Sequence, residues 1–224
     1  MYTNMSQYVS RFSLALAAVA LAWPAEAPNA LTAGEKRESF TLLFNGKDLS
    51  GWDGEPGLWS VKDGAIVGSS DNHPVKHNTF LIYKGEFADF ILRADIKLRN
   101  HNSGIQFRSQ RKHDWVVTGY QADASEVGEE KSAWGNFYDE QGKGRNLMRT
   151  PDEGWLKVKS QVRHGDWNRY EIVANGHRLI LRLNGVETID QEVEKTGAGV
   201  IAIQMHMGQP MEVQVRNIKL KVLR

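Results

Sequence analysis

Polar residues at alternate positions of three strand-like segments have the types and spacing that chemistry needs. The pairs are Gln106 and Arg108, Gln121 and Asp123, and Gln204 and His206. Side chains two residues apart in a strand point to the same face of a sheet. If the three strands adjoin, an arginine, a carboxylate and a histidine converge on one concave face. An ordinary solvated sheet face is the alternative, but the absence of Lys and Thr from the three pairs favours a site.

A second group of polar residues follows in the segment YDEQGKGR, which runs from residue 138 to residue 145. Its glycines and charges predict a loop. We expect this loop to cap the polar face with Tyr138, Glu140 and Arg145.

Other chemistry-bearing motifs are absent or weak. The chain has no cysteine, which excludes disulfides, thiolate zinc sites, iron–sulfur clusters and a cysteine nucleophile. His73 and His77 are four residues apart, but Pro74 and the surrounding turn residues predict exposed loop histidines and no metal site. A retaining glucanase on a jelly roll would carry the pattern E-x-D-x-x-E along a strand. The nearest text, residues 126–130, lacks the aspartate, so ordinary two-carboxylate glycosidase chemistry is disfavoured.

The elements that would position these residues read as β-strands. Apolar and polar residues alternate over residues 90–98 and again over 211–222, where a slip of phase at Arg216 and Asn217 predicts a bulge. Asn-Gly at 175–176 and 184–185, and Asp-Gly at 63–64, supply the positive φ values of tight hairpins. No stretch of a dozen residues has a clean helical period. The pattern predicts an all-β antiparallel sandwich or barrel.

Composition fits one globular domain. The 224 residues are 41% hydrophobic and 25% charged. The 28 basic and 27 acidic residues give a net charge of +1, which argues against a nucleic-acid-binding surface or a polybasic membrane patch.

The N-terminus resembles an export signal more than part of the fold. Arg11 precedes an apolar run over residues 12–23, and Ala25-Glu26-Ala27 follows with small residues at both outer positions. The run is too short for a membrane span, which needs about 20 residues. We expect residues 1–30 to be a signal peptide, residues 39–224 to be the folded domain, and the protein to be exported to the periplasm or secreted.

Seven ordered motifs resemble those of one family, the former DUF1080 family. They are FNGKDLSGW at 44–52, WSVKDG at 59–64, NSGIQFR at 102–108, and the segments 119–123, 135–139, 199–208 and 215–218. The resemblance implies a concanavalin-like jelly-roll sandwich. It also implies action on 3-keto sugars, as a 3-keto-disaccharide hydrolase or as a 3-keto-glycoside 1,2-lyase and 2-hydroxy-glucal hydratase. The family often has G-x-E-x-Q where this chain has Gly119 to Asp123, so the carboxylate moves two places along the same strand face.

This implied chemistry suits the polar residues. A ketone at C3 acidifies the hydrogen on C2, so a base can start the elimination of the aglycone and water can then add back. We expect Asp123 to be the base, His206 the acid or a partner of the base, and Arg108 the group at the enolate oxygen. Hydroxyl groups of the sugar would be held by Gln106, Gln121, Tyr138, Glu140, Arg145 and Gln204. A divalent metal held by His206 with Asp123 or Glu140 is the alternative to Arg108.

Two other classes of protein stay open at this point. A non-catalytic carbohydrate-binding module would use Trp115 or Trp134 as a stacking platform and would not need Asp123 close to His206. A structural interaction domain on a cell surface is the third reading. Sandwich folds serve all of these purposes, so the fold alone does not decide.

Overall fold

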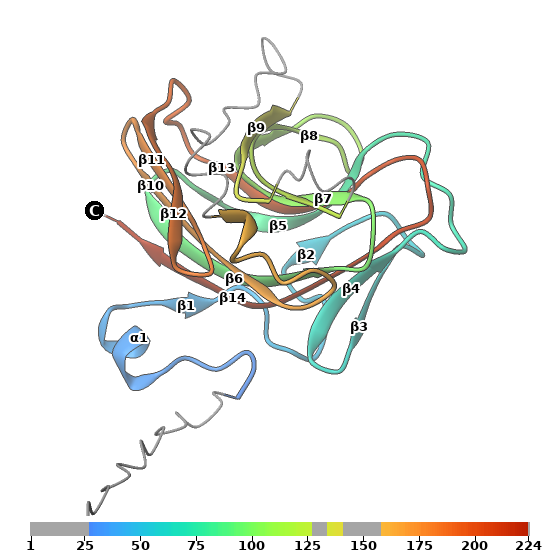
Figure 1. Ribbon diagram of the computed structural model, residues 1–224, viewed down its shortest axis with the longest axis horizontal. Helices are drawn as coiled ribbons and strands as arrows, with labels where there is room; N and C mark the ends of the chain where they lie inside the picture. The colour runs from blue at the N-terminus through green and yellow to red at the C-terminus, as the bar shows by residue number, and fades with distance from the viewer. Residues whose placement is uncertain (1–26, 127–133, 141–157, 224) are drawn as a thin grey trace, which may run out of the picture.

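Two antiparallel sheets form the protein, as the computed structural model shows for residues 27–126, 134–140 and 158–223 (Figure 1). Helix is confined to short pieces such as α1 (Ala33–Arg37). The predicted all-β class and the jelly-roll sandwich are therefore confirmed. Among the described residues, no helix is long and apolar enough to cross a membrane.

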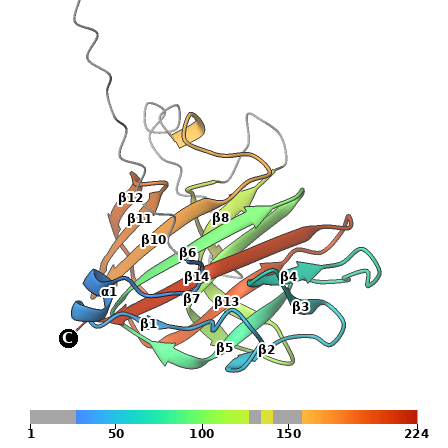
Figure 2. The same ribbon diagram turned by 90° about the horizontal axis from the view of Figure 1, so that it is seen from below.

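The first sheet has the order β12-β11-β10-β6-β14-β4-β3, and β1 pairs with β14 at the side. Its strands are β1 (Thr41–Leu42), β3 (Trp59–Lys62), β4 (Ala65–Ser69), β6 (Phe90–Leu98), β10 (Asn168–Asn175), β11 (Arg178–Leu183), β12 (Val186–Glu192) and β14 (Glu212–Val222). Figure 2 shows β10, β6 and β14 side by side across the middle of this sheet.

The second sheet has the order β2-β5-β13-β7-β8-β9. Its strands are β2 (Trp52–Asp53), β5 (Thr79–Phe87), β7 (Asn102–Arg111), β8 (Val117–Ser125), β9 (Phe137–Glu140) and β13 (Gly199–Met205). The prediction of a capping loop over residues 138–145 is wrong at its start, because Tyr138 and Glu140 belong to the edge strand β9.

The core lies between the two sheets and follows the alternation of the sequence. In β6, Phe90, Leu92 and Ile96 are fully buried, whereas Arg93 and Lys97 point to the other face. The second sheet contributes residues such as Ile105 and Phe107 to the same core. Removal of this apolar surface from water is the main stabilising term of the fold.

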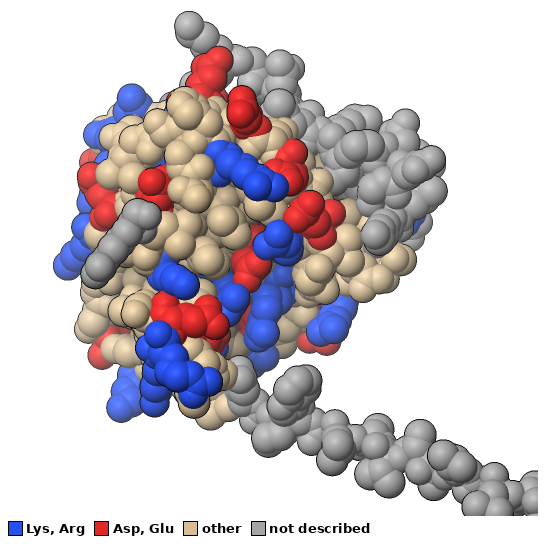
Figure 3. All heavy atoms as spheres, turned by 90° about the vertical axis from the view of Figure 1, so that its left-hand side faces the viewer, with Lys and Arg blue, Asp and Glu red and all other residues tan. Residues whose placement is uncertain are grey.

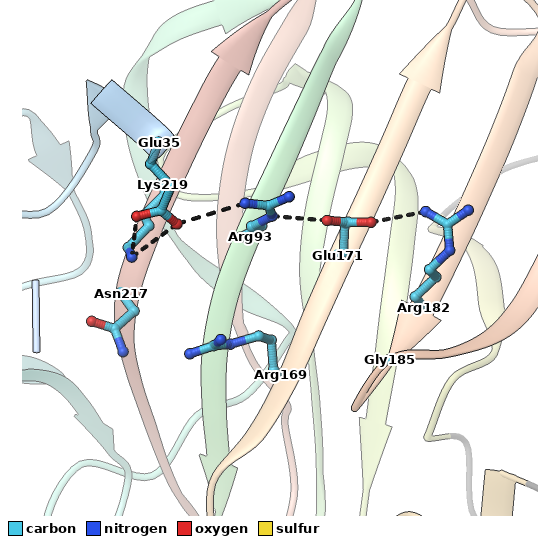
Figure 4. Close-up of a pocket in the computed structure, with 8 residues that line it drawn as sticks. All are labelled: Glu35, Arg93, Arg169, Glu171, Arg182, Gly185, Asn217 and Lys219. Carbon is cyan, nitrogen blue, oxygen red and sulfur yellow. Dashed lines mark hydrogen bonds and ion pairs between the residues drawn. The ribbon is translucent and has the colours of Figure 1, made fainter. Parts of the chain in front are cut away.

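The outer face of the first sheet carries a row of charges that runs across four strands. Lys219 lies opposite Arg93, Arg93 opposite Glu171, and Glu171 opposite Arg182 in the strand register. Acidic and basic side chains interleave on the side of the molecule where β10, β11 and β12 lie (Figure 3). Glu35 of α1 supplies the carboxylate between Lys219 and Arg93, with its oxygens 2.7 Å from Lys219 Nζ and 3.6 Å from Arg93 Nη1 (Figure 4).

The folded part of the chain begins earlier than residue 39. Asn29 and Asn217 exchange two hydrogen bonds of 2.6 and 2.9 Å between their side chains and main-chain N–H groups. Asn217 has a φ of 55° and lies where the register of β14 shifts, which confirms the predicted bulge. Thr32 and Glu35 then form a capping box at α1, so the segment before residue 39 is part of the folded unit.

Candidate functional site

Five polar side chains point from the second sheet away from the core. They are Gln106 on β7, Gln121 and Asp123 on β8, Glu140 on β9, and Gln204 on β13. Each alternates with core residues, as Gln106 does between Ile105 and Phe107, so the strand period places them on one face. All five are at most 6% exposed. We call these five residues, together with Asn78 and Ser109 that bond to them, the polar cluster.

Hydrogen bonds join the polar cluster into one chain whose donors all point the same way. Ser109 Oγ donates to Gln106 Oε1 at 2.6 Å, and Gln106 Nε2 donates to Gln121 Oε1 at 3.0 Å. Gln121 Nε2 then donates to Asp123 Oδ1 at 2.6 Å and to Gln204 Oε1 at 3.3 Å. The chain therefore ends on acceptors, and one of its ends is the carboxyl group of Asp123.

Glu140 is the second carboxyl group of the polar cluster. Gln204 Nε2 and Asn78 Nδ2 both donate to its oxygens at 3.3 Å. Strands β7 and β8 separate β9 from β13 in the sheet, so a bond between Glu140 and Gln204 requires the sheet to curl over this face. The curl makes the face concave, and it brings a residue of the edge strand to a central strand.

Gly104 leaves the room that Gln121 occupies. Gly104 lies opposite Asp123 in the register of β7 and β8, and Gln106 lies opposite Gln121. A Cβ atom at Gly104 would come within 2.6 Å of the Gln121 side chain and 2.8 Å of the Ala122 carbonyl oxygen. The absence of a side chain at this position thus allows Gln121 to reach Asp123 and Gln204 together.

The pKa of Asp123 is raised to about 8, mainly by burial and also by the nearby Glu140 carboxylate, against the hydrogen bond from Gln121, which lowers it. At neutral pH most molecules therefore carry a proton on Asp123. Two carboxyl groups in one hydrogen-bond network, one of them protonated, can act as a general acid and a general base.

One flank of the concave face is apolar. Phe80 and Ile82 of β5 and Ala202 of β13 form a buried cluster separate from the main core. Ala202 lies opposite both Gln106 and Ile82, and Gln204 lies opposite Phe80. All three side chains are at most 1% exposed, so this flank is packed within the protein and supports the polar residues beside it.

Arg108 does not join the polar cluster, and its expected place on this face is wrong. The register of β7 shifts between Phe107 and Gln110, and Arg108 has a φ of 47°. Its guanidinium instead donates to the carbonyl oxygens of Ala88, Gly176 and Lys195 and pairs with Asp89 at 2.8 Å. With a side chain 1% exposed, Arg108 ties turns together at the end of the sandwich.

His206 follows the last residue of β13 and lies beyond the polar cluster. Its ring centroid is 4.8 Å from that of His101, and its Nδ1 is 2.7 Å from the Met207 carbonyl oxygen. Asn78 connects this region to the polar cluster, because it accepts from Met207 N–H at 3.1 Å and donates to Glu140. His206 is thus near the Asn78 end of the network, whereas Asp123 bonds to Gln121.

The remaining candidates are placed as follows. Tyr138 lies opposite Gln121 in the register of β8 and β9 and is half-buried. Arg145 lies outside the described residues. Trp134 is fully buried and stacks on Tyr170 inside the protein, so it cannot be a stacking platform for a sugar. Trp115 is partly exposed, with its Nε1 3.0 Å from Asp53 Oδ1.

Metal ligands are not gathered in the parts of the chain that the structure describes. Over these residues, no group of three or more His, Asp or Glu side chains could hold a metal ion. His73 and His77 lie exposed in a loop, as expected. The alternative of a divalent metal held by His206 with Asp123 or Glu140 stays a prediction.

Sequence reasoning missed Asn78, Ser109 and Gly104. Asn78 lies outside any alternating strand text, and its bond to Glu140 depends on the curl of the sheet. Ser109 follows the irregular position at Arg108, so simple alternation misplaces it. Gly104 stands within the NSGIQFR motif, and that motif was the only available signal for it.

Solved structures share this architecture at low sequence identity. A provisionally named glycosyl hydrolase from Parabacteroides distasonis ATCC 8503 has a TM-score of 0.61 and 22% identity, covering 88% of this chain and 100% of its own. A second such structure from the same organism has a TM-score of 0.56 and 20% identity, covering 82% and 99%. The carbohydrate-binding module CBM66 from Bacillus subtilis has a TM-score of 0.56 and 16% identity, covering 76% and 96%. At these identities the likeness establishes the fold alone.

Family membership rests on the sequence. No curated protein matches the chain. The family model described as the 3-keto-alpha-glucoside-1,2-lyase-like domain matches residues 39–221, which include every strand from β1 to β13 and almost all of β14. The match confirms the resemblance seen in the seven ordered motifs. This chain therefore belongs to the family of 3-keto-α-glucoside-1,2-lyase-like domains.

Proposed function

We propose that this protein cleaves 3-keto glycosides by elimination and rehydration at the polar cluster. The observation that carries the proposal is the pair of buried carboxyl groups, Asp123 and Glu140, on one hydrogen-bond network. Family membership supplies the substrate class.

Elimination needs one base and one acid. A base removes the proton from C2, and the electron pair becomes the enolate of the C3 ketone. Re-formation of the ketone then makes the C1–C2 double bond and expels the aglycone oxygen from C1. That oxygen must gain a proton as it leaves.

We assign Glu140 as the base and Asp123 as the acid. This reverses the role expected of Asp123 from the sequence, because a carboxyl group with a pKa of about 8 holds its proton at neutral pH. Asp123 protonates the aglycone, and Glu140 takes the C2 proton.

The same pair can then add water. After elimination Asp123 is ionised and Glu140 is protonated. The Glu140 proton exchanges with solvent while the aglycone leaves and water enters. Asp123 then takes a proton from water as its oxygen adds to C1, and Glu140 gives a solvent-derived proton to C2. Both groups are restored, and the sum of the two steps is hydrolysis.

The amide side chains of the polar cluster hold the sugar. Gln106, Gln121 and Gln204 are neutral and buried. Each keeps an acceptor lone pair on its amide oxygen, and Gln106 and Gln204 each keep a second N–H for a hydroxyl group, whereas both N–H groups of Gln121 are used within the network. Tyr138 lies beside Gln121 at the half-exposed edge of the face.

Incubation with a 3-keto glucoside and with the same glucoside unoxidised, each with and without EDTA, tests the proposal by mass spectrometry of the products. We expect cleavage of the 3-keto compound alone, because an unoxidised sugar has no acidic hydrogen at C2. Asp123→Asn and Glu140→Gln should each lower kcat by about 10²–10⁴-fold. Cleavage of neither compound under any condition would favour a carbohydrate-binding module.

A direct glycosidase is the second candidate, and one observation favours it. The chain lacks the E-x-D-x-x-E pattern, yet the fold brings two buried carboxyl groups into one network. Such a pair can also protonate an ordinary glycosidic oxygen and activate water. Equal cleavage of oxidised and unoxidised glucosides would establish this candidate.

A further inference from the structure

A tyrosine from the opposite sheet crosses the core to the main chain of Asp123. Tyr170 lies on β10 of the first sheet and is fully buried. Its hydroxyl group donates to the carbonyl oxygen of Asp123 on β8 and accepts from the N–H of Gly135 at 2.6 Å. The Tyr170 hydroxyl thus connects the first sheet, β8 and the segment that leads into β9.

The position of this contact makes it specific to Asp123. The last paired residues of β8 and β9 are Ala122 and Phe137. Beyond them, the Asp123 N–H donates to the main-chain carbonyl oxygen of Asn136 at 3.0 Å. Gly135 has a φ of 80°, where the chain turns away from β8. The Tyr170 hydroxyl bridges the gap that opens there, so both main-chain polar groups of Asp123 are fixed.

Among the described residues, three groups interact with the Asp123 carboxyl. Gln121 of β8 donates to it, the Glu140 carboxylate of β9 raises its pKa, and its own charge raises the pKa of the Tyr170 hydroxyl of β10. Burial raises the pKa of the Tyr170 hydroxyl far above its ordinary value, so it remains a neutral donor throughout the working pH range. Trp134 stacks on the Tyr170 ring at an interplanar angle of 18° and holds it in place.

We propose that Tyr170 is a positioning residue for Asp123, which sets the direction of its carboxyl group through the main chain. The proposal rests on the proposed function in taking Asp123 as the acid. Its geometric basis, a hydroxyl bound to the Asp123 carbonyl, is independent of the substrate.

Tyr170→Phe removes only the hydroxyl group and keeps the ring in the core. We expect kcat on a 3-keto glucoside to fall by about 10- to 100-fold, because small displacements of a catalytic group are costly, while KM changes by less than about threefold. Looser packing also admits water to the carboxyl group. The pKa of Asp123, followed by carboxyl ¹³C NMR, should therefore move down by about half a unit or more.

Tyr120→Phe is the matched control. Tyr120 is also buried between the sheets, and its hydroxyl accepts a main-chain N–H, that of Lys195, at 2.8 Å. Loss of that bond should cost comparable stability but leave kcat and the Asp123 titration close to those of the wild type.

The two measurements separate this proposal from the proposed function. If the wild type cleaves no 3-keto glucoside, the proposed function fails, and the NMR titration alone decides the role of Tyr170. A larger shift of the Asp123 pKa in Tyr170→Phe than in Tyr120→Phe supports the positioning role of Tyr170. Equal titration curves in the two variants, or equal losses of kcat, would overturn it.

Discussion

Asp123 lies in an environment far from the ordinary one for an aspartate. It is 4% exposed, receives one hydrogen bond from Gln121, and shares its network with Glu140. The chain supplies amides around it and places Arg108, the nearest basic candidate from the sequence, elsewhere. A carboxyl group in such surroundings retains its proton, which is why we assign it as the acid.

The raised pKa of Asp123 predicts how stability depends on pH. The folded protein holds this proton up to about pH 8, whereas the unfolded chain releases it near 3.8. The proton on Asp123 therefore stabilises the folded protein fully below the pKa of the unfolded chain. This stabilisation is lost as the pH rises toward 8, at about 1.4 kcal/mol per pH unit for one proton. Asp123→Asn lacks this titration. We therefore expect its free energy of unfolding, measured in urea titrations, to rise relative to that of the wild type between about pH 4 and about pH 8.

Asp53→Asn provides a control of opposite sign. Hydrogen bonds from Trp115 and Arg111 lower the pKa of Asp53. The ionised Asp53 carboxylate therefore stabilises the folded protein above the pKa of the unfolded chain, and this stabilisation is lost as the pH falls. A constant difference between Asp123→Asn and the wild type over the whole range would show that Asp123 is not buried in its neutral form.

At the scale of elements, strand β7 determines the shape of the site through Gly104. Gly104→Ala places a methyl group against Gln121 and the Ala122 carbonyl oxygen. We expect a loss of stability of about 1–3 kcal/mol from overpacking, and a fall in kcat because Gln121 no longer reaches Asp123. Gly197→Ala is the control, since a Cβ there meets nothing within 4 Å. Equal activity of the two variants would argue against a role for Gln121.

Helix α1 is attached to the first sheet by charge. Lys219 and Arg93 lie opposite one another, and Glu35 separates their charges (Figure 4). The Lys219 side chain is 5% exposed, so Glu35→Gln removes a carboxylate that pairs with a nearly buried cation. We expect a lower melting temperature and a loss of about 2–4 kcal/mol by chemical denaturation.

Asp190→Asn is the matched comparison for Glu35→Gln. It breaks the exposed pair with Arg178, where both side chains are more than a third exposed, and should cost at most about 1 kcal/mol. If the two variants lose the same stability, the contact of α1 with the sheet is not electrostatic.

The sequence predicted those features that depend on local periodicity. Alternation over residues 90–98 gave β6, and the pair Gln121 and Asp123 was placed correctly because β8 is regular there. The prediction failed at Arg108, where an irregularity reverses the phase of β7. It missed the contact of Tyr170 with Asp123, because the two residues are far apart in sequence and meet only when the sheets stack.

At the scale of the whole molecule, the contacts of Asn29 bear on where the expected signal peptide would be cut. Asn29 is bonded to Asn217 and, through its Nδ2, to the Gly64 carbonyl oxygen at 2.7 Å. Signal cleavage after Ala27 keeps this residue, whereas cleavage after residue 30 removes it. We therefore propose that the signal peptide is cut upstream of Asn29, so that this residue stays in the exported protein. N-terminal sequencing of the exported protein should begin at or before Asn29, and a start beyond Asn29 or an intact Met1 would contradict the proposal.

The curl of the second sheet is the feature that unites the site, because it brings β9 over β13 and so places Glu140 in the network of Asp123. The chemistry assigned to this pair breaks and re-forms the C2–H bond of the sugar, which direct glycoside hydrolysis never does. The most direct test is therefore to cleave a 3-keto glucoside in D₂O and measure the C2 position of the released sugar by NMR, against the enzyme-free exchange rate. The account predicts one deuterium at C2 for each turnover by the wild type. Release of the aglycone with the original hydrogen retained at C2 would contradict it.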